Sequence, residues 1–209
     1  MSIGIAFRCS DGIVVCADSQ ITWQRHKDYE RKIHYLAGID WTMASVYSGN
    51  PHLMKSFFSK FVELVNARPH GKAATIKELS EIVETALCFF DELDTDSTAL
   101  NLLIGFIVPS TAIGLFRTEG KVVSEVLSSY DYVGYGDSSV VRYLSRIMAD
   151  KQEWLSINQA VRIGTYWVLQ AKRYIEDCGG DTDAFVLEWK GGMQTRSGDQ
   201  TGLLYQVEC

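Results

Sequence analysis

The chain opens with short apolar runs separated by polar turn signals. The apolar runs Ile3–Cys9 and Gly12–Asp18 flank an Asp-Gly pair, and Asp-Gly between two such runs predicts a β-hairpin. The polar stretch Ile21–Glu30 lacks this pattern and is predicted to be a loop. A second pair of apolar runs, Arg31–Gly38 and Trp41–Ser48, then predicts two more strands.

Beyond Gly49-Asn50-Pro51 the spacing of the apolar residues becomes helical. Pro51 suits the first turn of a helix, and apolar residues recur at helical spacing from Leu53 to Val65. Thr75 followed by Glu78 has the form of a capping box and predicts the start of a second helix. Three strands are predicted next, at Leu102–Val108, Ala112–Phe116 and Val122–Leu127. Two helices follow, one that carries Val140 to Met148 and a long one that runs from Ile157 and ends at Gly179-Gly180. The last two predicted strands are Thr182–Trp189 and Gly202–Val207.

The elements therefore follow one another as strands, two helices, strands, two helices and strands. Paired helices argue against the alternating order of a doubly wound parallel sheet. Two antiparallel sheets stacked face to face, with a helix pair on each outer side, would bury every apolar stripe of this pattern. The sequence thus predicts an α+β fold, a four-layer αββα sandwich, in a single domain over residues 1–209, because no linker divides the chain.

The composition changes this picture mainly by what it excludes. The 209 residues carry a net charge of −6, and Lys and Arg form no cluster larger than a pair, which argues against a nucleic-acid partner. The five cysteines are scattered without a Cys-x-x-Cys pair, so we expect neither a disulfide framework nor a metal site. No apolar run reaches the roughly 20 residues needed to cross a bilayer, and the start lacks the features of a signal peptide. We therefore expect a cytoplasmic protein with no membrane partner.

Ser2 becomes the first residue of the chain if the initiator Met1 is removed. A serine hydroxyl is a weak nucleophile that needs a base, and a free α-amine, with an unperturbed pKa of about 7.7–8.0, can serve as that base. Asp18 ends the second predicted strand, and antiparallel pairing brings it to the same end of the hairpin as Ser2. A fixed cation such as Lys32, held by Asp18, would lower the pKa of both the amine and the hydroxyl.

Several stretches resemble proteasome β-type subunits and the bacterial HslV-type peptidase, which are N-terminal-nucleophile (Ntn) hydrolases. They are SIGIAFRCSDGIVVCADSQIT, RKIHYLAG and WTMASVYSGNPHLMKSFF near the start, and VGYGDSS and CGGDTDAFV later in the chain. The resemblance extends over the whole chain in the order of its elements. It implies the Ntn-hydrolase fold, with Ser2 as the nucleophile, its amine as the base, and Asp18 paired with the pKa-lowering Lys32.

The resemblance also implies roles for residues outside this trio. Ser45 falls where the family has a glycine whose backbone N–H forms the oxyanion hole, and the specificity pocket would be lined by Ile21, Met43, Ala44 and Tyr47. The nucleophile Ser2 stands where the family has a threonine, and two further positions also depart from the family pattern. Tyr135 replaces a supporting serine between two glycines, and the family's late aspartate falls at Glu176 or Asp177.

The function that these features favour is that of a self-compartmentalising peptidase. Copies of the chain would assemble into homo-oligomeric rings or a spiral that encloses the nucleophiles, and Ser2 would cleave peptides or unfolded proteins without a cofactor. A separate ATP-driven unfoldase could deliver the substrates. Two alternatives remain open: a catalytically inactive structural subunit of a proteasome-like assembly, and an Ntn amidase that acts on small molecules.

Overall fold

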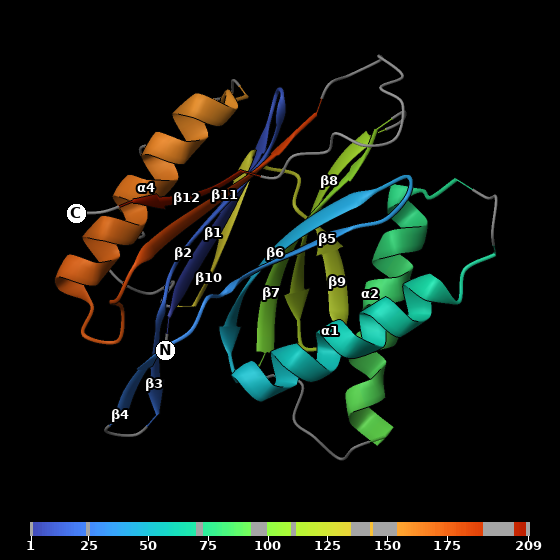
Figure 1. Cartoon of the computed structure of the whole chain (residues 1–209), viewed down its shortest axis with the longest axis horizontal. Coiled ribbons are helices and arrows are strands. Elements are labelled where there is room, and N and C mark those ends of the chain that lie inside the picture. Colours follow the sequence, from blue (N-terminus) through green and yellow to red (C-terminus); the bar gives the residue numbers. More distant parts are fainter. Residues whose placement is uncertain are drawn as a thin grey trace.

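Two five-stranded antiparallel sheets lie face to face in the computed structural model of the chain (Figure 1). The structure describes residues 2–23, 26–69, 73–92, 100–109, 112–134, 143, 154–189 and 203–207. Sheet I has the order β10 (Tyr130–Gly134), β1 (Ile3–Cys9), β2 (Gly12–Asp18), β11 (Thr182–Glu188) and β12 (Leu203–Val207). Sheet II has the order β5 (Ile33–Ala37), β6 (Thr42–Gly49), β7 (Leu100–Val108), β8 (Ala112–Glu119) and β9 (Val122–Glu125).

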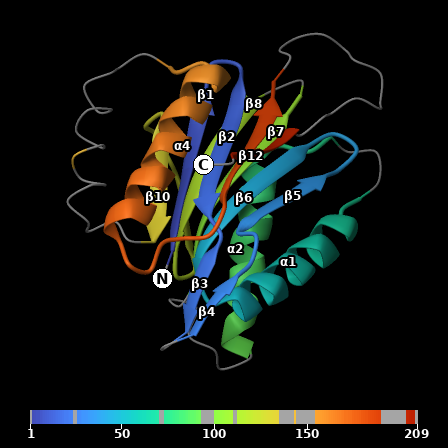
Figure 2. The same ribbon diagram turned by 60° about the vertical axis from the view of Figure 1, so that its left-hand side comes forward.

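Helices cover the outer face of each sheet (Figures 1 and 2). Helices α1 (Pro51–Asn66) and α2 (Ile76–Glu92) pack on sheet II, and α4 (Ile157–Tyr174) packs on sheet I. Local capping fixes where two of them begin. The Asn50 side chain accepts a hydrogen bond from the backbone N–H of His52 at the start of α1, and Ser156 and Gln159 form a capping box at the start of α4.

The three largest apolar clusters of the described residues hold these layers together. Strand β2 contributes to two of them because both of its faces are buried. Its Ile13 and Val15 pack between the sheets, whereas Val14 and Cys16 pack beneath α4. The third cluster lies between sheet II and the helix pair α1–α2. Strands that are buried on both faces appear in the sequence as continuous apolar runs, as the first two predicted strands do.

The four-layer α+β arrangement expected from the element order is confirmed. The helix expected to carry Val140 to Met148 falls outside the described residues. None of the helices that the structure describes is long and apolar enough to span a membrane.

Three details of the expected elements were wrong. The stretch Ile21–Glu30 is not a loop, because β3 (Gln20–Trp23) and β4 (His26–Tyr29) form a small antiparallel hairpin there. All of β4 is exposed, so the hairpin carries no apolar pattern that could reveal it. Helix α4 ends at Tyr174, well before Gly179-Gly180, and β10 lies in a segment for which no strand was predicted.

Candidate active site

The chain begins beside the end of strand β2. The β1–β2 register pairs Gly4 with Ala17, which places Asp18 next to the first residues of β1. The backbone N–H of Ile3 donates a hydrogen bond to Asp18 Oδ1 over 3.0 Å. Ser2 precedes β1 directly and is only 4% exposed. The structure thus brings Ser2 and Asp18 to one end of the hairpin.

Lys32 reaches this point from the segment just before β5. Its Nζ lies 2.7 Å from Asp18 Oδ1, and both side chains are at most 1% exposed. The ammonium also donates a hydrogen bond to the carbonyl of Gln20, and the Gly179 N–H donates to Asp18 Oδ2 over 3.1 Å. Burial lowers the pKa of Lys32 below its ordinary value, and the attraction of Asp18 opposes that change. The result is a cation fixed in place by a carboxylate that is itself held by two backbone N–H groups.

Ser2 and Lys32 line a common pocket of about 260 Å³. The hydroxyl of Ser2 lies 3.2 Å from the hydroxyl of Ser48 at the end of β6. Two residues expected in the specificity pocket, Ile21 on β3 and Tyr47 on β6, are part of its wall. The described residues that line it are Ser2, Ile21, Thr22, Lys32, Tyr47, Ser48, Gly49 and Asn50.

The structure does not bring Ser45, Met43 or Ala44 to this pocket. Ser45 is fully buried in the middle of β6, opposite His34 on β5 and Ile104 on β7. Its backbone N–H points toward one of these two strands and is therefore directed into the ladder of sheet II. Met43 packs in the cluster beneath α1 and α2, and Ala44 packs between the two sheets.

The pocket wall contains residues that the sequence did not single out for this purpose, above all Ser48, Gly49 and Asn50. The β5–β6 register ends at Val46, so β6 has no β5 neighbour beyond that residue. Any N–H of the Tyr47–Gly49 segment that points away from β7 therefore has no ladder partner. Gly49 has a φ of 124°, a conformation that side chains rarely allow. The only sequence signal for this turn was the Gly-Asn-Pro stretch that ends the strand.

The two supporting positions have different outcomes. Tyr135 lies outside the described residues. Asp177 is half-buried in the turn after α4 and is not among the residues that line the Ser2 pocket. Its neighbour Glu176 contributes a carbonyl that accepts hydrogen bonds from Gln20 Nε2 and Lys27 Nζ. This turn thus fastens the β3–β4 hairpin beside the pocket.

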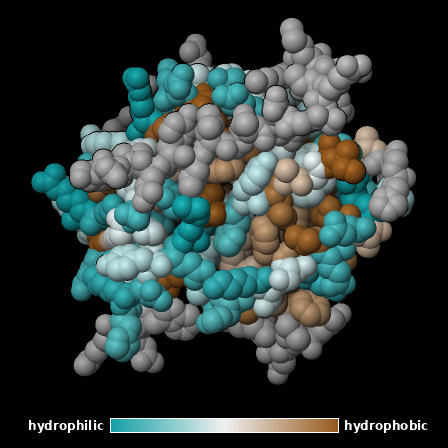
Figure 3. All heavy atoms as spheres, in the orientation of Figure 1, coloured by the Kyte–Doolittle hydropathy of each residue, from teal (hydrophilic) through white to brown (hydrophobic). Residues whose placement is uncertain are grey.

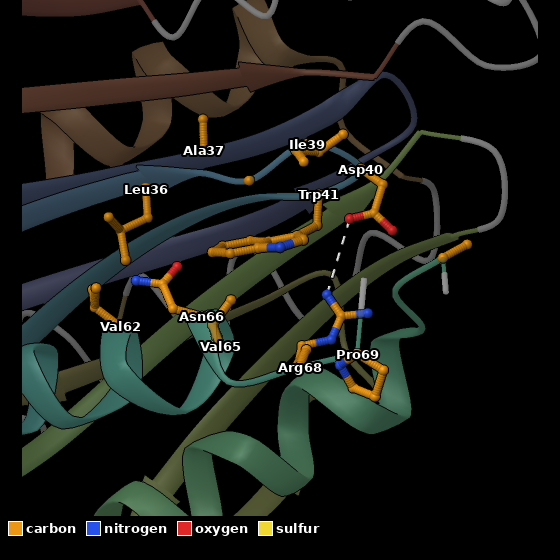
Figure 4. A pocket seen from close by; sticks show the side chains of 12 residues that line it. Leu36, Ala37, Ile39, Asp40, Trp41, Val62, Val65, Asn66, Arg68 and Pro69 are labelled. Carbon is orange, nitrogen blue, oxygen red and sulfur yellow. Dashed lines mark ion pairs between the residues drawn. The ribbon is translucent and has the colours of Figure 1, made fainter. Parts of the chain in front are cut away.

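A larger cavity of about 740 Å³ lies at the other end of β5 and β6, against the last turn of α1 (Figure 4). Trp41 and aliphatic side chains form its walls, and Arg68 and Asp40 approach to 3.9 Å at its edge. Figure 3 shows apolar residues gathered in a hollow in the region of these elements. The described residues that line the cavity include no nucleophile paired with a base. Among the residues that the structure describes, no group of three or more His, Cys, Asp or Glu side chains could hold a metal ion.

Comparison with known proteins identifies the fold. No protein-family model and no curated protein sequence matches the chain. The solved structures that match include an Anbu (Gly-1) mutant from Hyphomicrobium sp. strain MC1, with a TM-score of 0.77 and 14% identity over 90% of this chain and 82% of that one. Anbu (ancestral beta-subunit) from Yersinia bercovieri has a TM-score of 0.73 and 18% identity, over 89% of this chain and 82% of that one.

A third structure, the helical assembly of the Anbu complex from Pseudomonas aeruginosa, has a TM-score of 0.76 and 14% identity, over 98% of this chain and 86% of that one. These neighbours have the proteasome-like Ntn-hydrolase fold. The expected fold class is therefore confirmed: this chain adopts the Ntn-hydrolase fold.

Proposed function

We propose that the chain is an Ntn hydrolase that cleaves peptide bonds, with Ser2 as the nucleophile once Met1 has been removed. One observation carries this proposal: Ser2 shares its pocket with Lys32, whose ammonium is fixed by the buried carboxylate of Asp18. A cation beside the chain start favours the neutral amine and the ionised hydroxyl, which are the forms that the reaction needs.

The reaction would proceed by acyl transfer. Ser2 Oγ attacks the peptide carbonyl carbon while its proton passes to the Ser2 amine. The resulting ammonium returns the proton to the leaving amine as the peptide C–N bond breaks, which leaves an ester on Ser2. Water then attacks the ester, the amine again takes and returns one proton, and Ser2 Oγ is released. Lys32 remains an ammonium throughout and acts through its charge.

The negative oxygen of the tetrahedral intermediate needs hydrogen-bond donors. The best candidates are backbone N–H groups in the Ser48–Gly49 segment, because they border the pocket where β6 has lost its β5 neighbour. Ser45, which the sequence resemblance implied for this role, has strands on both sides. We therefore assign the oxyanion donor to the end of β6 in place of its centre.

Assembly of several copies is part of the proposal. One structural neighbour is described as a helical assembly of the Anbu complex, and this chain shares its fold over 98% of its length. We propose that copies of this chain associate into a ring or spiral with the Ser2 pockets facing an enclosed space. Such an arrangement would restrict the substrates to peptides and unfolded proteins.

Intact mass and turnover of fluorogenic peptides, measured on one preparation, test the function. We expect loss of one methionine, peptide hydrolysis, and a covalent adduct with a peptide boronate or β-lactone that the Ser2→Ala variant does not form. Retention of Met1 in protein from the native host, with no turnover, would contradict the proposal in favour of a structural subunit. Turnover of small amides without turnover of peptides would indicate an amidase.

A further inference from the structure

The hydroxyl of Ser2 has a specific partner, the hydroxyl of Ser48. The two Oγ atoms lie 3.2 Å apart, and the residues are 4% and 6% exposed. We infer that Ser48 is a catalytic residue that takes the proton of Ser2 Oγ and passes it on toward the Ser2 amine. This inference rests on the proposed function, because it assigns a role within the same reaction.

The fold fixes where the Ser48 side chain points. Ala44 and Val46 lie on the face of β6 that packs against sheet I, and the alternation of side chains along a strand places Ser48 on the same face. Ser48 lies opposite Asn101 of β7, past the last residue of β6 that β5 pairs with. Its hydroxyl therefore faces the start of β1, where Ser2 lies.

Gly134, at the end of β10, closes the contact from the third side. A Cβ atom at this position would lie 1.8 Å from the Ser2 carbonyl oxygen and 3.1 Å from Ser48 Oγ. Its φ of 99° is also a conformation that favours glycine. Glycine thus allows the backbone of β10 to approach the pair closely, and the two hydroxyls are held between three strands.

Two other polar side chains of the pocket are engaged elsewhere. Lys32 donates to Asp18 and to the Gln20 carbonyl, and the Asn50 side chain caps α1. The described residues of the pocket wall include neither a carboxylate nor an imidazole. Among the described residues that line it, Ser48 is the group whose hydrogen-bond contact with the attacking oxygen the structure shows.

A hydroxyl can carry a proton without a change in its own charge, because it donates one hydrogen and accepts at its lone pairs. As Ser2 Oγ bonds to the carbonyl carbon, its proton moves to Ser48 Oγ, and the proton of Ser48 moves on to the Ser2 amine. The amine becomes an ammonium and Ser48 stays neutral. The same path runs in reverse when Ser2 Oγ takes its proton back as it is released from the ester.

The variants Ser48→Ala and Ser48→Cys test this role. Both remove the hydroxyl, and the second keeps the size of the side chain. We expect kcat for a fluorogenic peptide to fall by about 10²-fold or more, with KM changed by less than about threefold, because proton transfer is affected and binding is not. Thr42→Val is the matched control, since Thr42 is buried on the same face of the same strand at its far end.

A proton inventory in mixtures of H₂O and D₂O separates the relay from a merely structural contact. We expect a curved plot for the wild type, in which two protons move, and a linear plot for Ser48→Ala. If turnover by Ser48→Ala stays within about threefold of the wild-type rate, the relay is wrong and the proposed function stands. If the wild-type protein shows no Ser2-dependent turnover, both the relay and the proposed function are wrong.

Discussion

Asp18 and Lys32 form an ion pair that the fold removes almost completely from water. We expect Asp18→Asn to lower the free energy of unfolding by about 3–5 kcal/mol, because it leaves a buried ammonium without its counter-charge. The pH dependence has a defined sign. Burial lowers the pKa of Lys32 from its ordinary 10.5, so the unfolded chain binds more protons just below that pH, and stability rises with pH there.

Loss of Asp18 removes the interaction that raises the pKa of Lys32, so in Asp18→Asn this rise in stability should begin at lower pH than in the wild type. Urea unfolding at a series of alkaline pH values measures both effects. Asp28→Asn, on the exposed strand β4, is the control and should change little. If Asp18→Asn and Asp28→Asn lower the free energy of unfolding equally, the buried ion pair does not stabilise the fold more than an exposed aspartate does.

At the residue scale, the sequence predicted the Ser2, Asp18 and Lys32 group better than its surroundings. The near-equal lengths of the first two strands were enough to place Ser2 beside Asp18. Lys32 was assigned by resemblance, because no periodicity fixes where a long connection ends. Ser45 was misplaced because the choice between the centre and the end of β6 depends on where β5 stops pairing, which is a tertiary property.

Among the elements, α4 packs closely against sheet I at Gly164. A Cβ atom there would lie 2.6 Å from Cys16 Sγ and 2.9 Å from Phe7 Cε2. Alanine is normally favoured over glycine inside a helix by about 1 kcal/mol, but overpacking costs about 1–3 kcal/mol. We expect Gly164→Ala to lower the free energy of unfolding by up to about 2 kcal/mol, measured by urea unfolding.

Cys16→Ala provides the check on this explanation. If crowding against the Cys16 sulfur sets the cost, the double variant should be more stable than the sum of the two single variants predicts. Arg162→Ala, exposed on the same helix, should have a small effect. A stabilised Gly164→Ala would mean that helix propensity outweighs the contact with sheet I.

Most elements with a buried face were predictable, whereas the fully exposed strand β4 was not. The strands of the first hairpin appear in the sequence as continuous apolar runs, and helices α1 and α2 follow a helical apolar periodicity. The β3–β4 hairpin is held by backbone bonds such as that from the Glu30 N–H to the Ser19 carbonyl, over 2.9 Å, and has no apolar pattern. The end of α4 was placed too late because Ile175 and Cys178 are buried beyond the helix and continue its apolar stripe.

At the scale of the whole molecule, the paired order of helices and strands was sufficient to predict the layers. Each sheet must bury two faces, and one layer of helices covers only one of them, so the second sheet has to cover the other. The position of the site follows from this arrangement. It lies where β1, β6 and β10 converge at one end of the sandwich, so strands that are distant in the sequence form the site together.

The same layers determine how the cysteines react. Cys9, Cys16 and Cys178 are at most 4% exposed, and Cys88 on α2 is exposed. Burial raises the pKa of Cys9 and of Cys178 to about 12, so their reactive thiolate forms are scarce as well as inaccessible.

We expect a thiol reagent to label Cys88 rapidly in the native Cys209→Ser variant, and to label the three buried thiols only as urea unfolds the chain. Peptide mass analysis measures each site, and labelling of Cys16 as fast as that of Cys88 without denaturant would contradict the sandwich packing, because Cys16 lies between sheet I and α4.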